Sequence, residues 1–414
     1  MTRQRSFLAP YLLVGTELKR DLYINVEDGV IRSVDADPAY PDSTVDFGAD
    51  TITYPACVNT HSHAFQALFR GSVNDLDLMT WLKRLYKQAE SATPEDIYRG
   101  ARLAFTEMLG NGITSVSDFF YVNGMGNENA HEVIRAAMDV GIRLNFNRVI
   151  MDNPVLAPQF REDLDTGLSR YEELVAAYPD SDRLTIGLAP HSIYYSSEAI
   201  LEAAHEQALE EGKKWHMHYS DSRSTRDIAL EKYGRSETQH LHEAGLLGPN
   251  FVGVHGIWAD EEDIALLAET GAHISHNPIS NRFIGEPLPD VYTMLEKGVN
   301  VGMGTDGAAS SPSLSVFEEV KHALIGQKSR HQDPEYLSMQ QGLELATVNG
   351  AAITGFNSGQ LATGYLADFM VCDATHPCLV PIENALSHFV YSLPSQAIRK
   401  VAVGGEFLVE RDAP

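Results

Sequence analysis

The sequence predicts an α/β protein in which a (β/α)8 TIM-like barrel is joined to a small β-sandwich formed by both ends of the chain. Three observations predict this fold. Eight short apolar runs alternate with helical patterns between residues 53 and 360, both chain ends alternate apolar and polar positions, and polar residues gather where the apolar runs end. The 414 residues suffice for one barrel of about 250 residues and an accessory domain.

The two ends of the chain predict the sandwich. Residues 7–47 alternate apolar and polar positions around a turn at Glu27-Asp28-Gly29, as antiparallel strands do. Near the other end, GYLADFMVCDA and IRKVAVGGEFLVE are typical of strands, and the second segment turns at Gly404-Gly405. We therefore expect residues 1–52 and 361–414 to pair into one β-sandwich.

Residues 53–360 predict the barrel. Segments with helical periodicity, such as SEAILEAAHEQALEEG and EEDIALLAETG, separate the apolar runs. Eight alternations of strand and helix favour a parallel sheet that closes into a barrel. The eight runs are TYPACVNTHSH, GITSVSDFF, IRLNFNRVI, LTIGLAPHS, KWHMHYSDS, FVGVHGI, AHISHNP and NVGMGTDG.

Polar side chains at the ends of these runs predict a functional site, because the carboxyl ends of barrel strands converge on one mouth. His61 and His63 lie two residues apart on an extended chain, so both imidazoles can reach one ion. Alone, such a pair is a weak signal in a chain with 16 histidines. A third histidine at a strand end and Asp306 after the last run complete three imidazoles and a carboxylate, which suit zinc or iron. The polar residues at the run ends are His61, His63, Asp118, His191, His218, Asp221, His255, His276, Asn277 and Asp306.

Composition limits the partners. The 57 acidic residues against 31 basic ones give a formal net charge of −26, which repels phosphates and argues against nucleic acid. No apolar run approaches the roughly 20 residues that span a bilayer, so we expect no membrane partner. The three cysteines, Cys57, Cys372 and Cys378, form no CxxC pair, which favours reduced thiols and a cytoplasmic location.

The motifs VNTHSHAFQALFRG, LAPHSIYYSSE, HMHYSDS, VHGIWADEED, SHNPISNRF and GMGTDGAASSPSLSVFEEV resemble the amidohydrolase superfamily. Within it, the chain resembles the branch of methylthioadenosine/S-adenosylhomocysteine deaminases, guanine deaminases and s-triazine hydrolases, over nearly its whole length. The resemblance implies that His61, His63, His218 and Asp306 bind a metal, that His255 hydrogen-bonds the attacking water, and that Asp306 also serves as the base. It also implies the sandwich and a homodimer or higher homo-oligomer.

The number of metal ions follows from one absent residue. The run before His191 contains no lysine that could be carbamylated to bridge two metals. We therefore expect one divalent ion, zinc before iron.

The chain departs from the related deaminases at the proton donor. Asp221 stands where they have a glutamate three residues after the fifth-strand histidine, and it is one methylene shorter. We expect Asp221 to act as the acid; the alternative is a structural carboxylate.

The substrate contacts also differ. Trp81, Arg148 and His191 match substrate-contacting positions, but Leu82 replaces a ribose-binding glutamate. Tyr194 replaces the arginine of formiminoglutamate deiminases. Trp81 can instead be a core or lid residue, and Arg148 can instead pair with a barrel carboxylate.

These features predict an enzyme that uses a metal-activated water to deaminate a small N-heterocycle of the purine, pterin, pyrimidine or triazine kind. Two alternatives stay open. The same site could remove chloride or an alkylamine, or open a cyclic amide, and the shorter acid favours this chemistry. A non-catalytic scaffold is disfavoured because all four ligand positions are filled.

Overall fold

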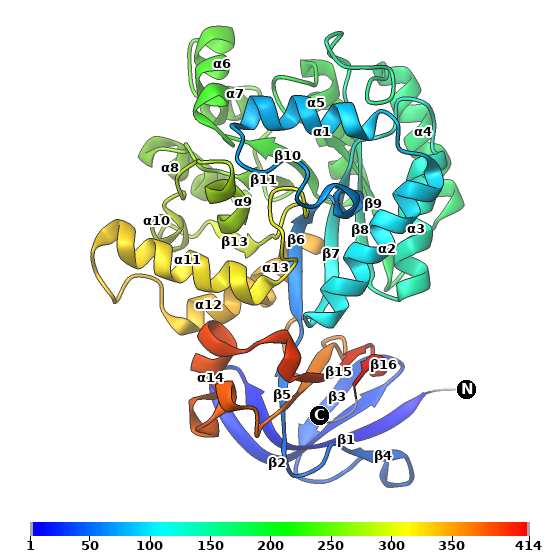
Figure 1. Ribbon diagram of the computed structural model, residues 1–414, viewed down its shortest axis with the longest axis vertical. Helices are drawn as coiled ribbons and strands as arrows, with labels where there is room; N and C mark the ends of the chain where they lie inside the picture. Colours follow the sequence, from blue (N-terminus) through cyan, green and yellow to red (C-terminus); the bar gives the residue numbers. More distant parts are fainter. Residues whose placement is uncertain (1–2, 412–414) are drawn as a thin grey trace.

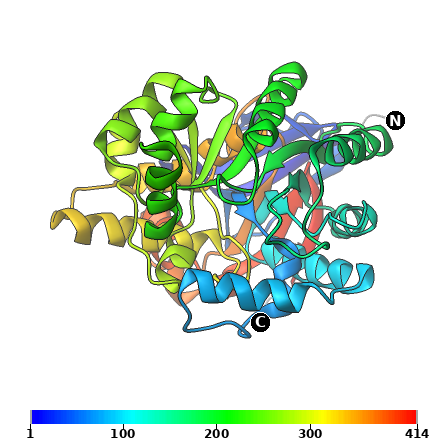
Figure 2. The same cartoon turned by 90° about the horizontal axis from the view of Figure 1, so that it is seen from above.

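The computed structural model describes residues 3–411. Residues 1–2 and 412–414, at the outer limits of the two predicted sandwich segments, lie outside the described part. Strands from both chain ends gather at one end of the molecule, and helices α1, α5 and α6 lie at the opposite end (Figure 1). Viewed from above, helices lie around the outside of the central strands (Figure 2).

All eight predicted strands of the central region form, and neighbouring strands run parallel. They form two four-stranded sheets, in the orders β6-β7-β8-β9 and β10-β11-β12-β13. Their bounds are β6 (Cys57–Ser62), β7 (Ile113–Phe120), β8 (Arg143–Ile150), β9 (Leu184–Pro190), β10 (Trp215–Tyr219), β11 (Phe251–His255), β12 (His273–His276) and β13 (Asn300–Met303).

This arrangement differs from the closed barrel that the sequence predicts, because regular strand pairing does not continue from one sheet to the other. Backbone hydrogen bonds nevertheless link the sheets at both seams. The N–H of His218 donates to the carbonyl of His191 at 3.0 Å, and the N–H of Asp306 donates to the carbonyl of His61 at 2.9 Å. The mixed α/β class is confirmed, and the strand ends that carry the candidate residues are held together.

Helices separate the strands, as the periodicity predicts. The segment EEDIALLAETG forms α8, which begins at a reciprocal cap between Asp260 and Asp263 and ends at Gly271, whose φ is 71°. Glycine adopts this left-handed conformation without a Cβ clash. The helices are α1 (Leu78–Ala89), α2 (Pro94–Gly110), α3 (Glu128–Val140), α4 (Leu164–Ala177), α5 (Glu198–Glu211), α6 (Arg223–Tyr233), α7 (Glu237–Glu243), α8 (Glu261–Thr270), α9 (Pro278–Phe283), α10 (Val291–Glu296), α11 (Val316–His331), α12 (Met339–Ala346), α13 (Val348–Thr354) and α14 (Ala385–Ser387).

Both chain ends contribute strands to one eight-stranded sheet. The sequence instead predicts a sandwich of two facing sheets. Its order is β16-β15-β14-β5-β1-β2-β3, with β4 paired to β1. The predicted hairpin at Gly404-Gly405 joins β15 to β16. The strands are β1 (Gln4–Val14), β2 (Glu17–Glu27), β3 (Val30–Asp35), β4 (Thr44–Asp46), β5 (Thr51–Pro55), β14 (Phe369–Asp373), β15 (Ile398–Val403) and β16 (Glu406–Glu410).

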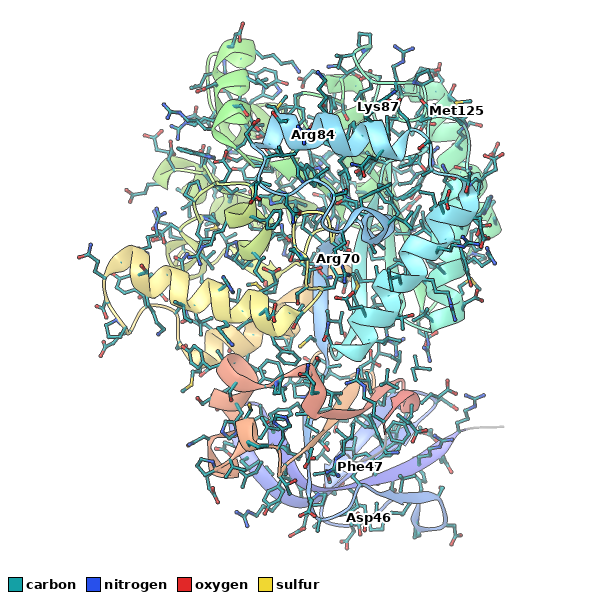
Figure 3. The ribbon with its side chains drawn as sticks, in the orientation of Figure 1. Asp46, Phe47, Arg70, Arg84, Lys87 and Met125 are labelled. Atoms are coloured by element: carbon teal, nitrogen blue, oxygen red, sulfur yellow. The ribbon has the colours of Figure 1, made fainter. Side chains whose placement is uncertain are left out.

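This terminal sheet has a hydrophobic core of its own, separate from the core of the central region. Phe7 and Phe369 meet edge to face with ring centroids 5.3 Å apart, so strands from opposite ends of the chain share one aromatic cluster. Phe47, which lies in this end of the molecule in Figure 3, stacks on Phe7. Within residues 3–411, no helix combines the length and the apolar character that crossing a membrane requires.

Candidate active site

The predicted metal ligands converge at the carboxyl ends of the parallel strands. His61 and His63 come from the end of β6, His218 from β10, and Asp306 follows β13. The Nε2 atoms of His63 and His218 lie 3.3 Å apart. Asp306 Oδ1 lies 3.6 Å from His61 Nε2 and 3.5 Å from His63 Nε2. These separations allow the four side chains to reach one ion.

Hydrogen bonds orient the imidazoles toward the centre of this group. His63 Nδ1 lies 2.6 Å from the carbonyl oxygen of Phe119, and His218 Nδ1 lies 3.2 Å from that of His191. A carbonyl only accepts, so each Nδ1 carries the proton and each Nε2 keeps its lone pair. Both ring nitrogens of His61 are buried and have no hydrogen-bond partner within residues 3–411. An orphaned imidazole beside two oriented ones fits a metal ion.

Burial favours the neutral imidazoles that metal binding requires. It lowers the pKa of His61 and of His218 well below the usual range, and neighbouring histidines lower both further. Burial also lowers the pKa of His63, although the negative charge of nearby Asp306 raises it in part.

Asp306 and His255 face each other across the candidate centre. Asp306 Oδ2 accepts from the Ser280 hydroxyl at 2.6 Å and lies 4.0 Å from His255 Nε2. His255 Nδ1 lies 2.8 Å from Asn281 Oδ1 and 3.3 Å from Asn277 Nδ2; the shorter contact is to an oxygen that only accepts, so Nδ1 carries the proton and Nε2 keeps its lone pair toward the centre. Asn281 thus orients His255.

Backbone conformation also marks the site. Ser220, His255 and Asp306 have φ values of 47°, 83° and 60°, which residues with a Cβ rarely adopt. All three lie where a strand ends at the site. Such residues persist only where surrounding contacts hold them, and they are common at functional sites.

Asp221 lies 5% exposed beside the ligands and is held at both oxygens. Its Oδ2 accepts from the Tyr194 hydroxyl at 3.0 Å, and its Oδ1 accepts from the Thr225 hydroxyl. Tyr194, at the position where formiminoglutamate deiminases have an arginine, therefore hydrogen-bonds the candidate acid.

A cavity opens onto the candidate metal group, and its outer wall is largely aromatic and aliphatic. None of the described residues that line it is a lysine or an arginine. The lining residues are His63, Gln66, Leu78, Trp81, Leu82, Tyr86, Tyr121, His191, Tyr194, His218, Asp221, His255, Ser280, Ile284, Asp306 and Ser310. The chemistry of this wall suits an uncharged, flat molecule.

Helix α1 covers one side of the cavity. Its inner face carries Trp81, whose indole N–H donates to the Ala309 carbonyl at 3.3 Å, and Tyr86, whose hydroxyl lies 3.0 Å from His191 Nε2. Arg84 and Lys87, both labelled in Figure 3, lie on the exposed side of the helix. The amphipathic helix therefore places apolar groups over the cavity and charges in solvent.

Two of the three predicted substrate contacts lie at the cavity, and the third does not. Trp81 and His191 line the cavity, whereas Arg148 does not. The buried guanidinium of Arg148 donates to both carboxylate oxygens of Glu162, at 3.1 Å for Oε2, and to Asn127 Oδ1 at 3.1 Å. The N–H donors of Arg148 are therefore bound away from the cavity. This ion pair with a carboxylate is the alternative role that the sequence allows for Arg148.

Sequence reasoning missed Tyr86, Tyr121 and Ser280. Tyr86 lies four residues after Leu82 on the same helix, so helical spacing places the two on one face of α1 but does not say what that face covers. Tyr121 directly follows β7, and Ser280 follows β12 on α9, where no pattern distinguishes a pocket hydroxyl from a structural one.

Asp118, one of the polar residues at the ends of the predicted strands, accepts from the backbone N–H of Ala64 at 2.6 Å. It therefore holds the chain directly after His63 and not the imidazole itself. Burial raises the pKa of Asp118 to about 7.

The chain belongs to the amidohydrolase family, whose sequence profile matches residues 52–408. It is 35% identical to a 5-methylthioadenosine/S-adenosylhomocysteine deaminase of Syntrophobacter fumaroxidans, over 89% of this chain and 82% of the relative. It is 34% identical to a 5'-deoxyadenosine deaminase of Methanosarcina mazei, over 93% and 87% of the two chains. The crystal structure of a Xanthomonas campestris adenosine deaminase with bound zinc superposes with a TM-score of 0.90 at 26% identity, covering 98% of this chain and 93% of the other.

Proposed function

We propose that this protein is a metal-dependent deaminase that hydrolyses the bond between a ring carbon and an exocyclic amine of a purine-like N-heterocycle. The observation that carries the proposal is the clustering of His61, His63, His218 and Asp306 beside a cavity with an aromatic wall, with His61 shared by the group of His63 and Asp306 and by the group of His218 and His255. The deaminase names of relatives more than 30% identical support the reaction type.

One divalent ion, zinc before iron, would be held by His61, His63, His218 and Asp306. When bound, it would supply a Lewis acid that lowers the pKa of water toward neutrality. The donor set fits zinc, and a zinc-bound structure with a similar fold supports that choice.

The residues of the chain would divide the proton transfers. Asp306 would take a proton from the attacking water, and His255, oriented by Asn281, would hold that water. The water oxygen attacks the ring carbon, and Asp221 in its protonated form gives a proton to the departing amine, so that ammonia leaves. The proton held by Asp306 passes to the ring nitrogen and the remaining hydroxyl proton returns to Asp221, so the ring keeps a carbonyl and both carboxyls regain their starting states. Each transfer by a positioned side chain contributes about 10²–10⁴-fold to the rate.

The cavity favours a free heterocycle over a nucleoside. Leu82 is 7% exposed and lines the cavity where a carboxylate would be needed to hold ribose hydroxyls. Trp81 and His191 supply a flat wall and a hydrogen-bonding group, and Arg148 stays within the fold. We expect the substrate to be neutral and to lack ribose.

Ammonia release tests this function. Protein loaded with Zn²⁺ or Fe²⁺ would be assayed on guanine, adenine, pterin, cytosine, 5'-deoxyadenosine and methylthioadenosine, with Asp306→Asn as the inactive control. We expect ammonia from at least one free base and slower turnover of the nucleosides. Protein that binds one ion per chain and releases no ammonia from any of them would contradict the proposal.

A second chemistry, hydrolytic loss of chloride or an alkylamine from a triazine, or opening of a cyclic amide, is favoured by Asp221. A chloride leaves as an anion and needs no proton, so the shorter reach of Asp221 matters less for that reaction. Chloro- and alkylamino-triazines and a cyclic amide, followed by absorbance, extend the same panel to this chemistry.

We further propose that residues 53–360 act as one barrel-like hydrolase domain and that residues 1–52 and 361–414 form one accessory β-domain, whose strands share a single sheet where the sequence predicts a β-sandwich. Hydrogen bonds at both seams of the two sheets support the first part, and the shared terminal core supports the second. A cytoplasmic location and homo-oligomerisation stay predictions.

A further inference from the structure

The segment Tyr219-Ser220-Asp221 joins β10 to the start of α6 and carries the candidate acid. Ser220 has a φ of 47°, in the left-handed region. A residue with a Cβ adopts this conformation at a cost, so contacts around the segment must hold it.

Two elements hold this segment. The loop after β11 binds its carbonyls, because the N–H of Gly256 donates to Tyr219 at 3.0 Å and that of Trp258 donates to Ser220 at 3.2 Å. From the opposite direction, Glu237 Oε2 accepts the N–H of Ser220 at 2.9 Å. Glu237 is therefore the group that holds the backbone N–H of Ser220, the residue with the left-handed conformation.

Glu237 is an unusual residue for a purely structural position. It is 4% exposed at the start of α7, and its second oxygen, Oε1, has no hydrogen-bond partner among the described residues. Burying a carboxyl that is only half satisfied is costly. A neutral acceptor would hold the same N–H at a lower cost.

Helix α7 is itself fixed, so Glu237 can act as a rigid support. Ser236, which caps the helix, donates to Asp263 Oδ1 of α8 at 2.5 Å. The adjacent Thr238 hydrogen-bonds the hydroxyl of Tyr219. Two consecutive residues of α7 thus hold two consecutive residues of the segment.

We propose that Glu237 is a positioning residue, whose carboxyl holds the Ser220 N–H and thereby fixes Asp221 where it can pass a proton to the leaving group. This inference rests on the proposed role of Asp221. The Asp221 carboxyl meets Tyr194 and Thr225 only while its backbone keeps this path. A displacement of about 1 Å in a reacting group can lower a rate by about 10²-fold.

The test compares two variants of similar volume, Glu237→Gln and Glu237→Met. Glutamine keeps an acceptor for the Ser220 N–H, and methionine removes it. Glu243→Ala, exposed on the same helix, is the control. The measurements are kcat and KM for ammonia release, metal content, and hydrogen exchange of the peptide that contains residues 219–222.

We expect Glu237→Met to lower kcat by about 10-fold to 10²-fold with KM within twofold. Its metal content should stay normal, and the 219–222 peptide should exchange faster. Glu237→Gln and the control should stay within threefold of the wild type. Wild-type turnover and exchange in Glu237→Met would overturn the proposal, as would equal loss in the Gln and Met variants.

The exchange measurement separates this proposal from the proposed function. If the wild type releases no ammonia from any substrate, the function fails, whereas protection of the 219–222 peptide still reports whether Glu237 holds the segment. Equal protection in the Gln and Met variants would then overturn the positioning role on its own.

Discussion

The backbone N–H of Asp306 donates to the carbonyl of His61 at 2.9 Å, so the first and last candidate ligands share a hydrogen bond across the seam between β13 and β6. At the other seam, the N–H of His218 donates to the carbonyl of His191. The residues of the site thus join the two sheets, and the spacing of the ligands depends on strands that are far apart in the sequence.

Removing His61 should abolish metal binding, because this imidazole is fully buried and its nitrogens form no hydrogen bond in the part of the chain that the structure describes. We expect His61→Ala to retain well below one ion per chain and to lose activity by at least about 10²-fold. Metal analysis of dialysed protein measures the first effect, and ammonia release the second.

The control for His61 is His242→Ala, because His242 is exposed on α7. It should keep both the ion and the activity. A full equivalent of metal in dialysed His61→Ala would remove His61 from the ligand set.

Asp221→Asn should lower kcat by about 10²–10⁴-fold, the loss typical of a general acid. Asparagine keeps the volume and can still accept from Tyr194, so the fold and the metal content should not change. Steady-state kinetics on the best substrate of the panel measure the effect.

The matched control for Asp221 is Asp227→Asn, an exposed carboxylate on the following helix. It should behave as the wild type. Near-normal turnover in Asp221→Asn would make Asp221 a structural carboxylate.

Local patterns predicted much of this molecule. His61 and His63 were found from the spacing of two imidazoles on an extended chain, and each of the eight apolar runs forms a strand. The partner of Arg148 could not be found in this way. Glu162 lies in the loop after β8, and only the folded path of that loop brings the two charges together.

Contacts between distant elements account for the other missed features. Tyr86 reaches His191 because α1 folds over the strand ends, which no local periodicity specifies. The division into two sheets depends on how strands that are far apart in the sequence meet at the seams, where regular strand pairing stops. The amidohydrolase assignment from the motifs is confirmed by the family match.

Arg148→Met should destabilise the protein and leave substrate binding nearly unchanged. The substitution leaves the Glu162 carboxylate in the interior with only Arg170 as its cationic partner. Breaking a buried ion pair from one side costs about 3–5 kcal/mol, reduced here by the second arginine. Urea unfolding measures the loss, and KM should stay within twofold.

The outcome distinguishes the two roles that the sequence allowed for Arg148. The control is Arg102→Met, an exposed arginine on α2, which should unfold as the wild type does. Unchanged stability with a strongly raised KM would return Arg148 to the substrate contacts.

The stability of the fold should depend on pH through Glu237. Burial, with smaller contributions from Asp221 and Asp263, raises the pKa of its carboxyl to about 8, against the lowering effects of the Ser220 N–H and of Lys232. In the unfolded chain a glutamate titrates near about 4.3. Because the folded pKa is the higher one, the folded protein holds the proton more tightly, and stability is lost as the pH rises through this window.

Glu237→Gln isolates this effect, because glutamine stays neutral at every pH and still accepts from Ser220. The free energy of unfolding of the variant minus that of the wild type should grow between pH 5 and 8, by at most about 1.4 kcal/mol per pH unit, and level off above. Urea unfolding of metal-loaded protein at pH 5, 6.5, 8 and 9 measures it, since pH effects on the metal site are shared and cancel in the difference. Parallel curves for Glu237→Gln and wild type would show that Glu237 is ionised throughout, and Glu243→Gln should follow the wild type in either case.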